Sequence, residues 1–117
     1  MLSIVRSGLS AASQEISVIS NNIANASSLG FKRSNASFSD IYTEMSDVRN
    51  ADRVGKGVRQ EAPRRNHSQG SLILTGNALD LGMNGQGMFI LNTIEKLGEL
   101  SYTRNGAINV QEDGKLV

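Results

Sequence analysis

The sequence predicts an α+β protein in which a long N-terminal heptad helix of the coiled-coil type precedes a linker and a small, mostly antiparallel β unit. Apolar residues recur every three or four positions through residues 1–26, which is the period of a helix. After Gly70 the period changes to two, which is the period of a strand. The 117 residues leave room for one small domain. We expect three segments: 1–30 as a packing helix, 31–70 as a short helix with a polar linker, and 71–117 as the start of a β domain.

The N-terminal helix carries an apolar seam whose members are spaced alternately three and four residues apart, a 3.5-residue repeat held over three heptads. The seam consists of Leu2, Val5, Leu9, Ala12, Ile16, Ile19 and Ile23. No proline interrupts it, so we expect a helix from Leu2 to Asn25 that is about 36 Å long. A second apolar row, Ile4, Ala11 and Val18, recurs every seven residues beside the seam. We expect both rows to be helix-packing interfaces, and a single helix lying on its own domain is the alternative.

The helix is expected to end between Ala26 and Gly30. Serines at positions 27 and 28 are weak helix formers, and a glycine can adopt the left-handed conformation that closes a helix. A second amphipathic helix, two turns long at most, is predicted from the i, i+3, i+4 and i+7 spacing of Phe38, Ile41, Tyr42 and Met45.

The segment from Ser46 to Gly70 is polar, and its composition predicts a solvated linker. Its cations outnumber its carboxylates: Arg49, Arg53, Lys56, Arg59, Arg64 and Arg65 stand against Asp47, Asp52 and Glu61. A phosphate-binding arm is the alternative interpretation. No aromatic residue lies between the cations to stack on bases, and the whole chain has a formal net charge of only +1, so we expect no nucleic-acid partner.

Short strands separated by turn pairs are expected after Gly70. Alternation with polar residues occurs at Leu79, Leu81 and Met83 and again at Ile108 and Val110. The apolar run from Met88 to Leu91 predicts a strand buried on both faces. Residue pairs that tolerate positive φ are Gly76-Asn77, Asn84-Gly85, Asn105-Gly106 and Asp113-Gly114. The chain stops just after the last pair, so we expect an incomplete β unit in a fragment.

Residues for catalysis or cofactor binding are scarce. The chain has no cysteine and a single histidine, His67, so neither a thiolate nor a histidine metal cluster is available. Gly85-Gln86-Gly87 departs from the dinucleotide fingerprint because Ile90 takes the third glycine position. We therefore expect no enzyme activity, no cofactor and no small-molecule substrate. The longest apolar run has four residues, far below the roughly 20 that cross a bilayer, so we expect no membrane insertion.

Three blocks of sequence resemble the bacterial flagellar rod and hook proteins. The first runs from Val18 to Arg33 around the core Asn21-Asn22-Ile23-Ala24-Asn25, and its motif residues are Asn21, Asn22, Asn25, Gly30 and Phe31. The second runs from Gln69 to Phe89, and the third comprises Tyr102 to Gly106 with Asp113 to Val117. Met88 departs from the pattern, because it stands where an aromatic residue is more usual. The pair Ser28-Leu29, in the turn after the helix, also departs from the pattern.

The resemblance implies a non-enzymatic axial subunit of the flagellum, in the hook or the rod, that self-assembles helically into a tube transmitting torque. Its implied partners are copies of itself, other flagellar axial proteins and the type III export apparatus. Its implied location is the basal body or hook, from the periplasm to the exterior, reached without a cleavable signal peptide. Members of the family end in a second heptad helix.

The resemblance therefore suggests that the seam packs on such a helix and that the row Ile4, Ala11 and Val18 contacts adjacent subunits. It also suggests that Asn21, Asn22 and Asn25 fix the turn after the helix. The segment Ala36 to Asp40 looks more like the hook protein, and a linker shorter than that of the distal rod protein favours the same choice. A small coiled-coil adaptor or regulatory protein is the alternative function.

Overall fold

The computed structural model describes residues 1–41, 55–93 and 98–117. Within it the chain forms two compact units. Unit 1 combines Met1–Ala24 with Arg33–Asn66, and unit 2 combines Asn25–Lys32 with His67–Val117. The fold is α+β, as predicted, with one described helix and antiparallel strand pairs. The division into segments 1–30, 31–70 and 71–117 stays a prediction.

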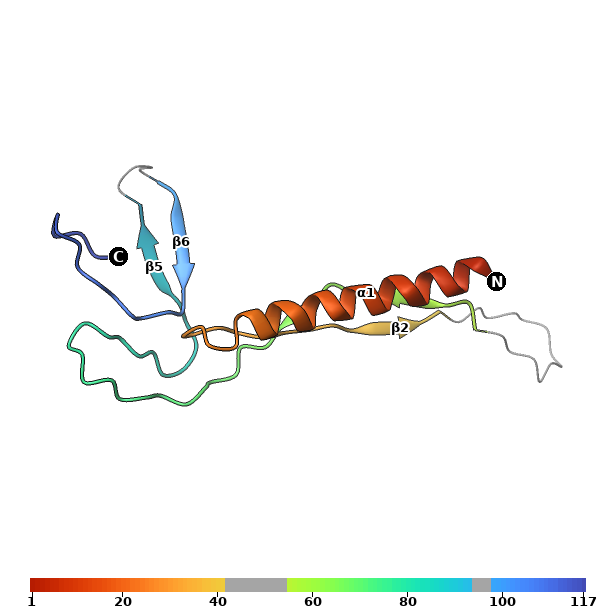
Figure 1. The fold of residues 1–117 in the computed structure, drawn as a ribbon, viewed down its shortest axis with the longest axis horizontal. Helices are drawn as coiled ribbons and strands as arrows, with labels where there is room; N and C mark the ends of the chain where they lie inside the picture. Colours follow the sequence, from red (N-terminus) through yellow and green to blue (C-terminus); the bar gives the residue numbers. More distant parts are fainter. Residues whose placement is uncertain (42–54, 94–97) are drawn as a thin grey trace. The chain divides into compact units, whose positions relative to one another are not determined.

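Helix α1 spans Leu2–Ala24 in unit 1, one residue short of the predicted end (Figure 1). A tight turn follows it, in which the Ser28 amide donates to the Asn25 carbonyl at 3.0 Å and the Phe31 amide donates to the Ser28 carbonyl at 3.4 Å. Gly30 has a φ of +70°, the left-handed conformation expected of it. The helix is therefore confirmed, whereas no second helix packs on it among the described residues to make a coiled coil.

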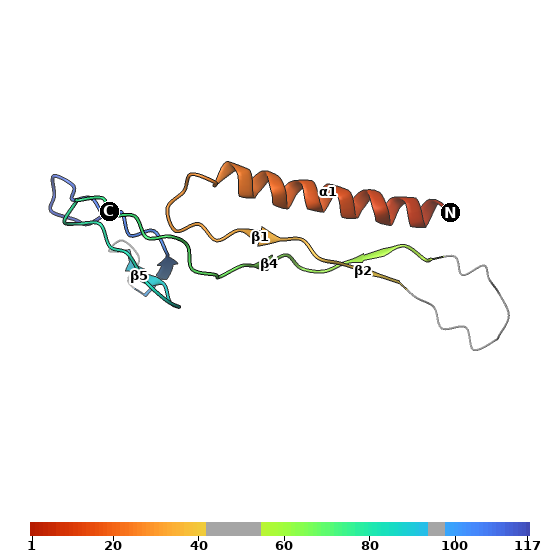
Figure 2. The same ribbon diagram turned by 90° about the horizontal axis from the view of Figure 1, so that it is seen from below.

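A two-stranded antiparallel ribbon lies along α1 in unit 1 (Figure 2). Near the end of the helix, β1 (Ser34–Asn35) pairs with β4 (Arg64–Arg65). Further along, β2 (Phe38–Asp40) pairs with β3 (Val58–Gln60). The Glu61 amide donates to the Ser37 carbonyl at 3.1 Å between these pairs, so the ribbon is continuous.

The ribbon corrects two expectations from the sequence. Residues 58–65, assigned to a solvated linker, contribute two of its strands. The predicted second helix is also wrong where it can be checked, because Phe38 lies in a strand and Ile41 is not helical. Long-range pairing with Val58–Gln60 satisfies the backbone there, and local helical spacing carries no information about such pairing. Tyr42 and Met45, like Arg49 and Arg53 of the linker, lie outside the described residues.

Unit 2 contains the hairpin of β5 (Phe89–Asn92) and β6 (Leu100–Thr103), with Phe89 opposite Thr103 (Figure 1). Strand β5 matches the predicted strand in position, but Ile90 is 63% and Leu91 50% exposed, so burial on both faces is wrong. The sequence analysis missed β6. The strands predicted from alternation are reduced to isolated bridges, Asp80 with Ala107 and Val110 with Leu116.

The described residues bury very little apolar surface. Ala11, at 7% exposure, is the one hydrophobic residue among them that is buried. Two-stranded hairpins are marginal in water without a face packed against another element. The helices within the described ranges include none that is long and apolar enough to cross a bilayer. Both units therefore leave apolar side chains available for contacts with other polypeptide segments.

Candidate functional site

Helix α1 presents one face to the ribbon of its own unit. At 3.6 residues per turn, positions separated by three or four residues fall on one side of the helix. The half-buried or buried residues of α1 follow this spacing: Ile4, Ser7, Ala11, Gln14, Val18 and Asn22. Hydrogen bonds from three of them to the ribbon identify this side as the ribbon-facing one. This set is called the ribbon face below.

The contacts on the ribbon face are mostly polar. The Ser7 hydroxyl accepts a hydrogen bond from the Val58 amide at 3.3 Å and donates to the Ile4 carbonyl at 2.8 Å. Gln14 Nε2 donates to the Glu61 carbonyl at 3.4 Å. Such contacts fix the ribbon along the helix without creating an apolar core.

Asn22 makes the most specific contact on the ribbon face. Its Nδ2 donates to the Ser34 carbonyl at 2.8 Å, and its Oδ1 accepts from the Ser34 amide at 3.0 Å. The side-chain amide thus pairs with both backbone groups of a residue 12 positions further along the chain. Asn25, in contrast, contacts the turn itself, where its Oδ1 accepts from the Ser28 hydroxyl at 3.4 Å. The roles suggested for Asn21 and Asn25 stay predictions, whereas Asn22 holds the first strand of the ribbon.

The ribbon face also corrects the position of the second apolar row. Ile4, Ala11 and Val18 lie on it, roughly 130° round the helix from the seam, rather than beside the seam. The backbone of Ile4 comes within 3.7 Å of the position that a Cβ on Gly57 would occupy. The row is therefore partly covered by its own ribbon in this chain, and its contact with adjacent subunits stays a prediction. Sequence periodicity identified the row but gave no sign of the polar segment that covers it.

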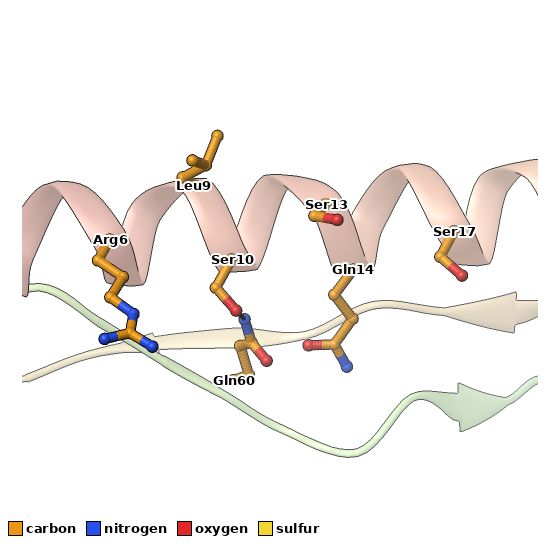
Figure 3. Close-up of a pocket in the computed structure, with 7 residues that line it drawn as sticks. All are labelled: Arg6, Leu9, Ser10, Ser13, Gln14, Ser17 and Gln60. Atoms are coloured by element: carbon orange, nitrogen blue, oxygen red, sulfur yellow. Dashed lines mark hydrogen bonds between the residues drawn. The ribbon is translucent and has the colours of Figure 1, made fainter.

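The seam, on the other side of α1, is bare. Its large side chains are exposed by 87% at Leu2, 66% at Val5, 72% at Leu9, 65% at Ile16, 47% at Ile19 and 69% at Ile23, and the smaller Ala12 is exposed too. Figure 3 shows Leu9 pointing away from the ribbon while Gln14 and Arg6 point toward it. A contiguous apolar stripe of this kind on a protein surface marks an interaction site.

A shallow polar hollow flanks the seam within unit 1 (Figure 3). It is lined by Arg6, Leu9, Ser10, Ser13, Gln14, Ser17 and Gln60. Gln60 Nε2 donates to the Ser10 hydroxyl at 2.7 Å, whereas Gln14 Oε1 is buried and accepts no hydrogen bond from any described residue. The described ranges contain no group of three or more histidine or carboxylate side chains that could hold a metal ion. Nothing in the hollow supplies a nucleophile with an adjacent base.

The motif blocks of the sequence meet in unit 2 around Arg104. Its Nη1 donates to the Gly87 carbonyl at 2.5 Å, and its Nη2 donates to the Gly85 carbonyl at 2.6 Å and to Gln69 Oε1 at 2.7 Å. Gly30 approaches the other side of the same residue, since a Cβ on it would lie 2.5 Å from the Arg104 carbonyl oxygen. Phe31 beside it is half-buried. The three blocks therefore form one junction, which their wide separation along the chain concealed.

Within unit 1, helix α1 therefore has one face occupied by the ribbon and a bare apolar seam on another. Residues 2–32 match the family described as flagella basal body rod protein. Over 128 aligned positions, covering 99% of this chain, it is 38% identical to the flagellar basal-body rod protein FlgG of Agrobacterium fabrum and spans 48% of that relative. A FlgG of Buchnera aphidicola is 35% identical, over 97% of this chain and 47% of the relative.

A hook protein is similar to the chain as well. The flagellar hook protein FlgE of Escherichia coli is 35% identical over 95% of this chain, which spans 25% of that relative. The chain thus spans about half the length of the rod relatives it matches. It belongs to the flagellar rod and hook protein family, as its motif blocks indicated.

Proposed function

We propose that the chain is a structural axial subunit of the flagellum, in the rod or the hook, that assembles with copies of itself and with other axial proteins through the seam of α1. Its relatives carry the names of structural rod and hook proteins rather than of enzymes. The observation that carries the proposal is the bare seam on a well-formed helix whose opposite face is already occupied.

The seam offers enough apolar surface to drive assembly. Burying a leucine or isoleucine side chain contributes about 1.5 to 3 kcal/mol. Four large positions that are 47% to 72% exposed, Leu9, Ile16, Ile19 and Ile23, would together contribute roughly 3 to 8 kcal/mol per subunit as an upper figure. Exposed ion pairs contribute about 0 to 1 kcal/mol each, so the seam dominates the free energy of association.

The ribbon restricts the geometry of assembly. Because it partly covers the face with Ile4, Ala11 and Val18, the seam and its flanks are the most open surface of α1 for neighbouring helices. Contacts between different surfaces of identical copies generate open helical arrays when the rotation between copies does not close a ring. A tube made of such subunits would transmit torque through these repeated helix contacts. Export by the flagellar type III apparatus belongs to the same proposal.

A charge placed on the seam tests the proposal. In bacteria whose own copy of the gene carries Ile16→Asp, we expect loss of the flagellum beyond the affected segment and loss of swimming, measured by electron microscopy and motility assays. Ser17→Asp is the matched control, since it places the same charge one residue further on, away from the seam. Normal flagella in the Ile16→Asp strain, at unchanged protein level, would refute the assignment of the seam.

A further inference from the structure

The ribbon of unit 1 carries several cationic side chains that pair with no residue of the described ranges. Its described residues hold five cationic side chains, Arg33, Lys56, Arg59, Arg64 and Arg65, against two carboxylates, Asp40 and Glu61. All five are exposed, and the structure gives none of them a side-chain hydrogen bond or ion pair with a described residue. The seam accounts for none of these charges, because it lies on the far side of the helix.

The arginines gather at the β1–β4 end of the ribbon. Arg65 stands opposite Ser34 and Arg64 opposite Asn35 in the antiparallel register. Arg33 immediately precedes β1, and its carbonyl accepts from the Asn66 amide at 2.9 Å. The three arginines therefore occupy neighbouring backbone positions at this end of the ribbon, and we call this cluster the basic end of the ribbon. A guanidinium binds a carboxylate through two parallel hydrogen bonds, which favours carboxylate partners.

Unit 2 presents a complementary acidic turn. Residues 109–117 form a hairpin in which the Asn109 amide donates to the Val117 carbonyl at 2.7 Å and the Gln111 amide donates to the Lys115 carbonyl at 2.9 Å. Glu112 and Asp113 occupy its tip, exposed and without partners among the described residues, and Lys115 follows them. Gly114, with a φ of +78°, closes the turn. The two carboxylates are thus held next to each other on an ordered tip.

We propose that the basic end of the ribbon in one copy binds the Glu112–Asp113 turn of another copy. The proposal rests on the function proposed above and adds a second contact to the seam. The two surfaces differ and each copy carries one of each, so the contact leaves a free basic end and a free turn on every pair and can be extended indefinitely. Exposed ion pairs contribute little free energy individually, so this contact selects the direction and register in which seams meet.

A nucleic acid is the other polyanion that could meet a basic cluster. It fits less well, because no aromatic side chain stands among the arginines to stack on bases and Glu61 lies in the same strand segment. Binding of an acidic peptide to the arginines requires only a pair of carboxylates, and this chain supplies such a pair. Binding of a single-stranded oligonucleotide in place of a second copy is therefore an outcome that the test includes.

Paired charge reversals in the 117-residue chain test the proposal by sedimentation at low salt and at about 1 M salt, where the screening length is about 3 Å. One variant carries Arg64→Glu with Arg65→Glu, and the other carries Glu112→Lys with Asp113→Lys. We expect each alone to associate about tenfold more weakly than the unaltered chain at low salt, with the difference vanishing at high salt. Mixing the two variants should restore association, since each then supplies the charge that the other needs.

Two controls separate this contact from its alternatives. Glu15→Lys reverses a carboxylate on α1 and should leave association unchanged, whereas Ile16→Asp should weaken association at both salt concentrations. The proposal is overturned if mixing the two variants does not restore association. It is also overturned if both variants associate as strongly as the unaltered chain, or if the unaltered chain shows no association that depends on salt. The proposal is likewise overturned if the unaltered chain binds an oligonucleotide and the variant with Arg64→Glu and Arg65→Glu loses this binding but still self-associates. In any of these cases a continuing effect of Ile16→Asp would leave the proposed function intact.

Discussion

Replacing Asn22 with alanine should detach the ribbon from the end of α1. The substitution removes two hydrogen bonds, at 2.8 Å to the Ser34 carbonyl and at 3.0 Å from the Ser34 amide. A buried backbone group that loses its partner costs about 1 to 3 kcal/mol, and Asn22 is half-buried, so we take the lower part of this range, about 1 to 2 kcal/mol, for the pair. Because Ala11 is the only buried residue among the described residues of unit 1, no apolar core compensates for the loss.

Hydrogen exchange of the Ser34 amide measures this effect at the contact itself. A loss of 1 to 2 kcal/mol corresponds to an exchange rate about 5 to 30 times faster in Asn22→Ala. Asn22→Asp is the informative comparison, because its carboxylate still accepts from the Ser34 amide but no longer donates to the Ser34 carbonyl, so protection should fall less. Ser20→Ala, at an exposed position on the same helix, controls for helix propensity. Unchanged Ser34 exchange in Asn22→Ala would refute the pairing.

Two further predictions concern the junction in unit 2. Gly30→Ala forces an L side chain into a φ of +70° and places its Cβ 2.5 Å from the Arg104 carbonyl oxygen. The Gly106 carbonyl, two residues after Arg104, accepts a hydrogen bond from the Leu81 amide. We therefore expect the Leu81 amide to exchange about 5 to 30 times faster in Gly30→Ala. A Leu81 exchange rate equal to that of the unaltered chain would exclude this contact. Arg104→Lys retains the charge, but the lysine cannot reach the Gly85 and Gly87 carbonyls together. The Gly85 amide donates to Gln69 Oε1 at 3.2 Å in the same loop. We therefore expect the Gly85 amide to exchange about fivefold faster in Arg104→Lys. Identical Gly85 protection in both chains would show that the charge alone holds the loop.

The sequence predicted those elements whose signals are local. Heptad spacing located α1 to within one residue, and the apolar run placed β5, because both patterns depend on residues close together in the chain. The ribbon escaped prediction because its strands are two or three residues long and pair polar segments that lie far apart in the sequence. Periodicity also placed Ile4, Ala11 and Val18 on an apolar row correctly, yet the covering partner is a chain segment rich in serine and arginine.

The candidate site divides in the same way. The sequence predicts an exposed seam because the chain has too few apolar residues to cover both faces of the helix. The structure leaves the seam bare. The Asn22 contact and the Arg104 junction needed coordinates, because each joins residues that no periodic pattern relates. The motif blocks identified the residues of the junction but did not indicate that these residues lie together in unit 2.

We propose that the seam of α1 is free in the separate chain and covered in the flagellum. The chain has no cysteine, so a single Ile16→Cys substitution supplies a unique thiol on the seam, and Glu15→Cys supplies one beside it. The rate of thiol labelling in the isolated protein should resemble that of an exposed cysteine at both positions. In isolated flagella that contain the protein, we expect the cysteine at position 16 to be labelled much more slowly than the cysteine at position 15. Equal, rapid labelling at both positions in assembled flagella would contradict it.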